Sequence, residues 1–254
     1  MITIKTPDEI QKMRQAGQLV ASILGMLEKK VAPGVSTGEL NARAEEDCRK
    51  HGAIPVFKNY PHPYRGRPFP GAICASVNEE VVHGIPGEKK LREGDIISID
   101  FGVILNGYAG DSALTIAVGE ADPRVLKLIK VTEESLMKGI EQAHAGKRLG
   151  AISHAIQSYA ESHGYSVVRD FVGHGIGKEM HEDPPVPNYG SSNRGPVLKT
   201  GMTLAIEPML NMGSDHIIVE ADQWTVKTRD GKPSAHFEHT IVIGATGPEI
   251  LTLR

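Results

Sequence analysis

Five residues from position 100 onward form an ordered set of four carboxylates and one imidazole: Asp100, Asp111, His174, Glu207 and Glu238. One imidazole among oxygen ligands suits Mn, Fe(II), Co or Zn, and these ligand types leave the choice among the four metals open. Four carboxylates balance two divalent cations, which in dinuclear sites lie roughly 3.5–4 Å apart with water or hydroxide between them. The set therefore predicts a site for two divalent metal ions and a nucleophile.

Asp100 and Asp111 lie in two strand-like runs, 96–105 and 108–118, joined by Asn106-Gly107, a strong short-range hairpin signal. A two-residue turn places Asp111 diagonally across from Asp100 on the same face of the hairpin, roughly 7–8 Å away at the backbone. Two carboxylates at this spacing repel each other unless a cation lies between them. The hairpin therefore predicts two neighbouring metal ligands.

The other three ligands interrupt segments that the sequence predicts to be buried. Glu207 ends the apolar run 202–206, and Glu238 precedes the apolar run 240–243. A buried carboxylate without a partner is energetically expensive. His174 lies between glycines in the segment GHGIG, where missing side chains allow the backbone to approach a site closely, although a flexible turn would explain the glycines equally well.

Helix and strand signals define the elements that must position these residues. Capping boxes at Thr6–Glu9 and Ser36–Glu39, and the pair Asp122-Pro123, mark helix starts. The predicted helices are Pro7–Lys30, a second from Ser36 toward His51, a third from Pro123 to Ile140 and a fourth over Leu149–His163. Further strands are predicted at Met202–Glu207, Ile217–Val219, Trp224–Thr228 and Thr240–Ile243.

Five positions in the helical part of the first half match the second half at one fixed offset of 112 residues, and later positions match in the same order at other offsets. Asp100 is equivalent to Glu207 in this repeat, and Asp111 is equivalent to Glu238. His83 corresponds to His174. We infer a duplicated helix-helix-sheet unit with a pseudo-twofold axis near the metals. The positions that match at the fixed offset are Gly34, Gly38, Leu40, His51 and Gly52 with Gly146, Gly150, Ile152, His163 and Gly164.

Unequal insertions between the halves predict where substrate contacts lie. From the histidine that ends the second helix of each half to the following HGI motif takes 32 residues in the first half and 11 in the second. From that motif to the glycine before the next strand takes 11 and 27 residues, and from the first carboxylate to the second takes 11 and 31. Function concentrates on loops held by a rigid scaffold, so we expect substrate contacts in the longer member of each pair. These insertions contain Tyr60, Tyr64, Phe69, Cys74, Met180, His181 and Trp224.

Length and composition indicate one globular domain over residues 1–254, with halves at about 1–120 and 121–254. The chain has 40% hydrophobic and 23% charged residues and a net charge of −3, so no basic excess points to nucleic acid. Cys48 and Cys74 are too few for a disulfide framework. The sequence start has no signal segment, and no apolar run is long enough to span a bilayer. We therefore expect a cytoplasmic protein without a membrane or nucleic-acid partner.

Four longer motifs extend this pattern: SIDFGVILNGYAGDSA, GHGIGKEMHEDP, AIEPML and WTVKTRDGKPSAHFEHT. Together they resemble the bacterial type I methionine aminopeptidases, and the resemblance covers nearly the whole chain. It implies the α+β pita-bread fold, in which two pseudo-twofold-related halves contribute antiparallel strands covered by helices. It also implies a monomeric metallo-hydrolase that removes the N-terminal methionine of nascent polypeptides and peptides, prefers a small second residue, and has the ribosome as a candidate partner.

The resemblance implies a role for each of the five ligands. Asp111 and Glu238 match the carboxylates that bridge the two ions. Asp100 matches the ligand that chelates one ion, and His174 with Glu207 match the ligands that complete the other.

The resemblance also implies that His83, His181 and Glu207 are catalytic. In this family a metal-bridging hydroxide attacks the carbonyl after methionine, the free amino terminus binds metal, and Glu207 would transfer the proton. His181 would donate a hydrogen bond to the carbonyl or tetrahedral oxygen, and His83 would lie near the scissile nitrogen. Without the resemblance, either histidine could equally be structural.

Four residues, Phe69, Cys74, His83 and Trp224, match the family's pocket for the methionine side chain. Aromatic and sulfur neighbours suit a thioether, although such sets are more often ordinary core.

The chain departs from the family pattern in two places. Met180 precedes His181 where many members carry an aromatic residue, and the loop 58–70 lacks a second cysteine, whose place Tyr60 and Tyr64 would take.

Three alternatives share the expected fold. An aminopeptidase P or prolidase has the same ligands but typically an amino-terminal domain, and only 82 residues precede His83. A type II methionine aminopeptidase carries a helical insertion between His174 and Glu207, which are only 33 residues apart here. A non-catalytic pita-bread binding protein would usually have lost metal ligands, and this chain retains the full set.

Overall fold

The strand order of the main sheet follows the duplication of the chain. The computed structural model describes residues 1–62 and 66–253, and its largest sheet runs β1, β4, β5, β14, β9, β7, β8, with β2 beside β4 and β15 beside β14. The order is symmetric about the β5–β14 pair, since β4 and β5 of the first half adjoin β14 and β9 of the second. The bounds are β1 (Ile54–Pro55), β2 (Cys74–Val77), β4 (Ile96–Leu105), β5 (Tyr108–Ala117), β7 (Gly173–Gly175), β8 (Glu182–Val186), β9 (Thr203–Ile206), β14 (Glu238–Ile243) and β15 (Pro248–Ile250).

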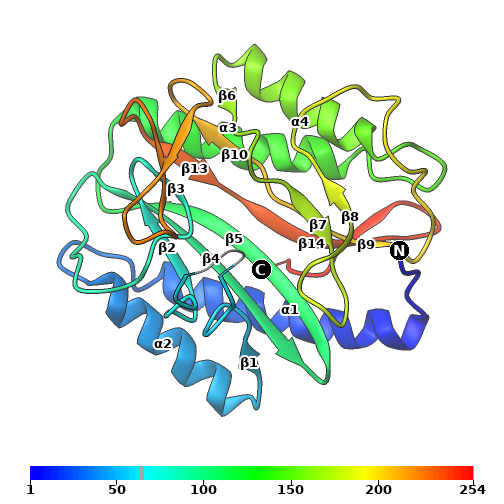
Figure 1. Cartoon of the computed structure of the whole chain (residues 1–254), viewed down its shortest axis with the longest axis horizontal. Helices are drawn as coiled ribbons and strands as arrows, with labels where there is room; N and C mark the ends of the chain where they lie inside the picture. The colour runs from blue at the N-terminus through cyan, green and yellow to red at the C-terminus, as the bar shows by residue number, and fades with distance from the viewer. Residues whose placement is uncertain (63–65, 254) are drawn as a thin grey trace.

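The helices follow the two halves of the chain: α1 and α2 lie along the first-half strands in the lower part of the view, and α3 and α4 lie along the second-half strands in the upper part (Figure 1). Their bounds are α1 (Pro7–Glu28), α2 (Thr37–Lys50), α3 (Pro123–Ile140) and α4 (Gly150–Ser162). Two smaller antiparallel sheets complete the described part of the fold, β13 (Ser234–His236) with β10 (Met209–Asn211) and β6 (Ser166–Val167), and β11 (Ile217–Val219) with β12 (Val226–Thr228) and β3 (Glu80–Val82). Within the described residues, no helix is long and apolar enough to cross a membrane.

Local signals account for the helix starts. Thr6 accepts a hydrogen bond from the Glu9 backbone, and the Glu9 side chain accepts one from the Thr6 backbone, which is the predicted capping box. Ser36 and Glu39 repeat the arrangement at α2. All four predicted helices are confirmed within two residues at each end.

The repeat is visible in the backbone itself. Gly34 and Gly146 both have a φ of 90°; the first donates its N–H to the Leu91 carbonyl shortly before β4, and the second donates to the Leu198 carbonyl shortly before the equivalent β9. The residues that end α2 and α4, His51 and His163, share φ −97° and ψ 2°. Equivalent sequence positions therefore adopt the same conformation.

The hairpin between β4 and β5 has the predicted register. Asn106 and Gly107 both have positive φ, 53° and 77°, as a type I′ turn requires. Asp100 lies opposite Ala113, and Asp111 lies opposite Gly102, so the two aspartates are diagonal neighbours as predicted.

Strand alternation separates the core face of the sheet from the ligand face. Ile99 and Phe101 flank Asp100 and are fully buried in the core that contacts α1. Successive side chains of a strand point to opposite faces, so Asp100 faces away from that core. The residues of this core include Leu24, Leu27, Ile97, Val103, Ile152, Ile156, Leu204 and Ile241.

The strand predicted over Met202–Glu207 spans Thr203–Ile206, and two other predicted strands start two residues away from their observed starts. The strand predicted over Trp224–Thr228 begins at Val226, because Asp222 accepts hydrogen bonds from the N–H groups of Trp224 and Thr225 and holds them in a turn. The last long strand begins at Glu238 rather than Thr240, since Glu238 pairs with Ala113 of β5.

Candidate metal centre

The five predicted ligands line one cavity of about 240 Å³ at the centre of the main sheet. Asp100 lies on β4, Asp111 on β5, Glu238 on β14 and His174 on β7, and Glu207 follows β9 directly. Five strands that adjoin in the sheet thus bring together residues that are spread over 139 positions of the chain.

The distances suit divalent ions. Asp111, His174 and Glu238 are buried and offer ligand atoms that all lie within 4.8 Å of one another. His174 Nε2 lies 3.6 Å from Glu207 Oε1. Two donors that each bind one ion at roughly 2.0–2.2 Å are roughly 3–3.6 Å apart, so both spacings are compatible with shared cations.

The four carboxylates repel one another and have no basic partner among the described residues. Burial raises the pKa of Asp111 to about 7. Burial and repulsion from neighbouring carboxylates raise the pKa values of Asp100, Glu207 and Glu238 well above their usual range. Among the described residues, no lysine or arginine forms an ion pair with any of the four.

Three carboxylate oxygens of the site have no hydrogen-bond partner within the described part of the chain. Oδ1 of Asp100, Oδ1 of Asp111 and Oε1 of Glu238 are buried without a hydrogen-bond partner among the described residues. Unpaired buried oxygens are rare because their desolvation is uncompensated. The donor set therefore fits divalent cations.

The histidines of the cavity are neutral near pH 7. Burial lowers the pKa of both His174 and His83 to about 4, and repulsion from His181 adds to the effect. Burial also lowers the pKa of His181. Neutral imidazole is the form that binds a metal through one nitrogen or donates a hydrogen bond from the other.

Tyr60 orients one of these histidines. Its hydroxyl lies 2.8 Å from His181 Nδ1, and the His181 ring lies 4.3 Å from the His174 ring. When the tyrosine O–H donates to Nδ1, the proton of His181 resides on Nε2. Tyr60 therefore lines the cavity as predicted, whereas Tyr64 lies outside the described residues.

The predicted pocket residues line the same cavity. Trp224 packs edge-to-face on Phe69 at 5.3 Å and on His83 at 6.2 Å, and its Nε1 donates to the Arg67 carbonyl at 2.9 Å. Cys74 lies opposite Asp100 in the β2–β4 register, and its burial raises the pKa of the thiol. Met180 also lines the cavity.

His83 has an unusual backbone conformation. Its φ of 59° lies in the left-handed region, which non-glycine residues seldom adopt. Such conformations persist where the surrounding structure holds them, often at functional sites.

Sequence reasoning missed three residues of this site, Phe57, Gly102 and His236. Phe57 lines the cavity. A Cβ on Gly102 would lie 3.0 Å from Asp111 Oδ1, so the glycine leaves room for that carboxylate, and an isolated glycine within a strand is the signal that pointed to it. His236 is 1% exposed, and its Nε2 lies 3.9 Å from Glu207 Oε2.

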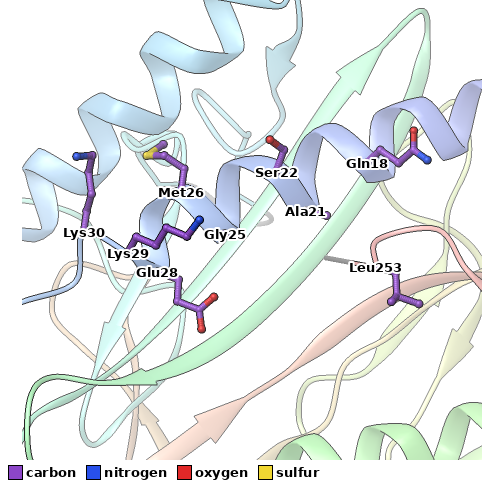
Figure 2. A pocket seen from close by; sticks show the side chains of 9 residues that line it. All are labelled: Gln18, Ala21, Ser22, Gly25, Met26, Glu28, Lys29, Lys30 and Leu253. Carbon is purple, nitrogen blue, oxygen red and sulfur yellow. The ribbon is translucent and has the colours of Figure 1, made fainter.

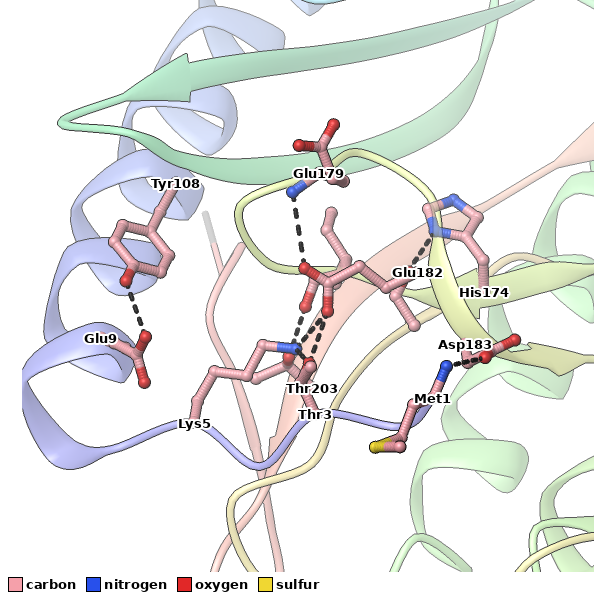
Figure 3. A network of polar contacts seen from close by, with 12 residues as sticks. Met1, Thr3, Lys5, Glu9, Tyr108, His174, Glu179, Glu182, Asp183 and Thr203 are labelled. Atoms are coloured by element: carbon pink, nitrogen blue, oxygen red, sulfur yellow. Dashed lines mark hydrogen bonds and ion pairs between the residues drawn. The ribbon is translucent and has the colours of Figure 1, made fainter.

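The segment that carries Met180 and His181 is held by the N-terminal strap, residues 1–5 (Figure 3). Lys5 Nζ lies 2.5 Å from Glu182 Oε2, and the Thr3 hydroxyl donates to the same oxygen at 2.7 Å. A buried ion pair thus anchors the residue next to His181.

A larger hollow of about 940 Å³ lies on the outer face of α1 (Figure 2). Its lining contains no histidine, cysteine or aspartate, so it offers no comparable chemistry. The lining residues are Gln18, Ala21, Ser22, Gly25, Met26, Glu28, Lys29, Lys30 and Leu253.

Comparison with known proteins tests the family resemblance that the sequence motifs indicate. The model of metallopeptidase family M24 matches residues 11–245. The chain belongs to this family. Among M24 relatives, the methionine aminopeptidase of Clostridium acetobutylicum is 56% identical over 254 residues, covering 100% of this chain and 99% of that protein. Methionine aminopeptidase 1 of Bacillus subtilis is 56% identical over 252 residues, covering 99% of each chain.

Solved M24 structures agree. Methionine aminopeptidase from Thermotoga maritima matches with a TM-score of 0.96 and 48% identity, covering 100% of both chains. An Xaa-Pro dipeptidase from Bacillus anthracis matches with a TM-score of 0.77 and 25% identity, but the match covers 62% of that chain against 99% of this one. The predictions of a pita-bread fold and of a methionine aminopeptidase, a metal-dependent hydrolase, are therefore confirmed.

Proposed function

We propose that this chain removes the N-terminal methionine from polypeptides and peptides whose second residue is small, using two divalent metal ions. The observation that carries the proposal is the cluster of four carboxylates, two buried and two half-buried, with no basic partner among the described residues, set beside a neutral His174. Asp111 and Glu238 would be shared by both ions, Asp100 would serve one, and His174 with Glu207 would serve the other.

Bound metal would supply an activated water and polarise the scissile carbonyl. The protein's own groups would handle protons and orientation. Glu207 would take the proton from the attacking water at a carboxylate oxygen and deliver it to the leaving nitrogen.

The two histidines would act as neutral hydrogen-bonding groups. The Tyr60 hydroxyl on His181 Nδ1 leaves an Nε2–H that would donate to the carbonyl oxygen as negative charge develops there. His83, held beside Trp224, would lie near the scissile nitrogen.

The cavity supports a methionine side chain as occupant. A volume of about 240 Å³ bordered by Phe69, Cys74 and Trp224 offers aromatic and sulfur contacts, which favour a flexible thioether. Met180 and Tyr60 narrow the same cavity, which supports discrimination by the size of the second residue.

A peptide panel with metal titration tests the proposal. Metal-stripped protein should regain activity with about two equivalents of Mn, Fe(II), Co or Zn, and Met-Ala-Ser should be cleaved well above Met-Lys-Ser and Leu-Ala-Ser. Equal cleavage of the first two peptides would refute the size preference. Glu207→Gln should abolish turnover while the exposed control Glu161→Gln retains it, and near-normal hydrolysis by Glu207→Gln would remove Glu207 from the mechanism.

We also propose that residues 1–254 act as one monomeric catalytic domain in the cytoplasm, where nascent chains emerge from the ribosome. The symmetric strand order, with ligands contributed by both halves, supports a single unit. Sedimentation analysis tests the monomer, and co-sedimentation with ribosomes tests the association.

A further inference from the structure

Glu207 lies between two imidazoles that face different oxygens of its carboxylate. His174 Nε2 is 3.6 Å from Oε1, and His236 Nε2 is 3.9 Å from Oε2. His174 is a predicted metal ligand, whereas His236 has no part in the mechanism above.

His236 is held rigidly in this place. Its N–H donates to the Thr115 hydroxyl at 2.8 Å, and that hydroxyl donates to the His236 carbonyl at 2.9 Å. The β10–β13 register pairs His236 with Met209, two residues beyond Glu207. The backbone of His236 is therefore fixed beside the segment that carries Glu207.

The side chain of His236 is 1% exposed, and its Nε2 has no hydrogen-bond partner among the described residues. A buried polar atom without a partner is destabilising, so such an atom in a rigid position usually has a functional explanation. The Glu207 carboxylate is the acceptor that Nε2 approaches from this position.

We propose that His236 is a positioning residue whose Nε2–H donates to Glu207 Oε2, so that Oε1 faces the metal shared with His174. The inference rests on the proposed function, because Glu207 is there both metal ligand and proton carrier. Fixing one oxygen removes the freedom of the carboxylate to rotate or to chelate through both oxygens. Oε2 is then the oxygen that carries the proton.

The test compares His236→Leu, which removes the donor at similar volume, with His236→Gln, whose amide keeps a donor. His163→Gln, which changes an imidazole at the end of α4 that does not line the cavity, is the control. The readouts are kcat and KM on Met-Ala-Ser, Co(II) affinity by calorimetry and the visible spectrum of the Co(II)-loaded protein.

We expect His236→Leu to lose about 10–100-fold in kcat or Co(II) affinity, as for other groups that orient a metal ligand, with KM changed by less than about threefold. His236→Gln should recover most of this loss and keep the wild-type Co(II) spectrum. In a Glu207→Ala background, His236→Leu should have no further effect on Co(II) affinity, because its partner is absent.

Wild-type kcat and Co(II) affinity in His236→Leu would overturn the inference. An altered Co(II) spectrum in His236→Gln would also overturn it, since His236 would then be a ligand itself. If His236→Leu does not fold, two measurements still test the inference. They are the Co(II) spectrum of His236→Gln and the effect of His236→Gln on Co(II) affinity with and without Glu207→Ala. Failure of the wild-type protein to hydrolyse the peptide would instead refute the proposed function.

Discussion

Replacing Lys5 by methionine should weaken both the fold and the segment 179–182 that carries His181. The Lys5 and Glu182 side chains are only 6% and 14% exposed, and their charged atoms lie 2.5 Å apart. Methionine keeps the length and the apolar stem but removes the ammonium group. Glu182 would then keep one hydroxyl donor at 2.7 Å and one backbone N–H at 3.4 Å.

The expected loss follows from this geometry. Removing one partner of a buried ion pair destabilises a protein by about 3–5 kcal/mol, because the remaining charge is uncompensated. Glu182 is slightly exposed and keeps two donors, so we expect about 2–3 kcal/mol, which lowers the Tm of a chain of this size by about 4–10 °C. Because Glu182 directly follows His181, kcat should fall as well.

Thermal and urea unfolding at fixed metal concentration measure the loss of stability. The double variant Lys5→Met/Glu182→Gln should recover most of it, because the uncompensated charge is gone. Arg43→Met, which breaks an exposed pair whose side chains are 55% and 36% exposed, should change stability by less than about 0.5 kcal/mol. A Lys5→Met effect as small as that of Arg43→Met, or no recovery in the double variant, would refute the reasoning.

Three further variants test other parts of the structure. Gly102→Ala puts a Cβ 2.7 Å from Val56 Cγ2 and 3.0 Å from Asp111 Oδ1, so the Val56 side chain and the carboxylate must both shift. The variant should lower Co(II) affinity at least about tenfold by calorimetry, and unchanged affinity in the folded variant would contradict the close approach to Asp111. Tyr60→Phe removes the hydrogen bond on His181 Nδ1 and should lower kcat about tenfold with little change in KM, and a change in KM alone would assign Tyr60 to binding. The backbone hydrogen bond of the helix cap lowers the pKa of Glu9 to about 2, so its stabilisation should be full above pH 4.5 and disappear as the pH falls toward 2. Glu9→Gln should therefore remove about 1 kcal/mol of pH-dependent stability, after allowing for solvent screening, and should flatten the plot of Tm against pH in this range. An unchanged plot would exclude the cap as the cause of the pH dependence.

Short-range interactions made much of the fold predictable. The capping boxes at Thr6 and Ser36 lie within four residues of sequence, and the Asn106-Gly107 turn fixes its register by its own φ angles. The internal repeat extended this local information, because equivalent carboxylates had to occupy equivalent strands. The order of the ligands along the chain therefore predicted the pseudo-twofold symmetry of the sheet.

The short strands were less predictable. The strand β7 consists of Gly173–Gly175 and has no apolar alternation, and β8 contains two prolines. Such strands form because neighbouring strands supply their hydrogen bonds, rather than through their own propensity.

The sequence by itself determined which residues could hold metal and in which order they arrive at the centre of the sheet. Only the tertiary structure decided how these residues are supported: Tyr60 on His181, Lys5 on Glu182 and the approach of His236 to Glu207. The first two contacts join residues 121 and 177 positions apart. No local periodicity or turn chemistry specifies such pairs, since they exist only when the strands and the N-terminal strap pack together.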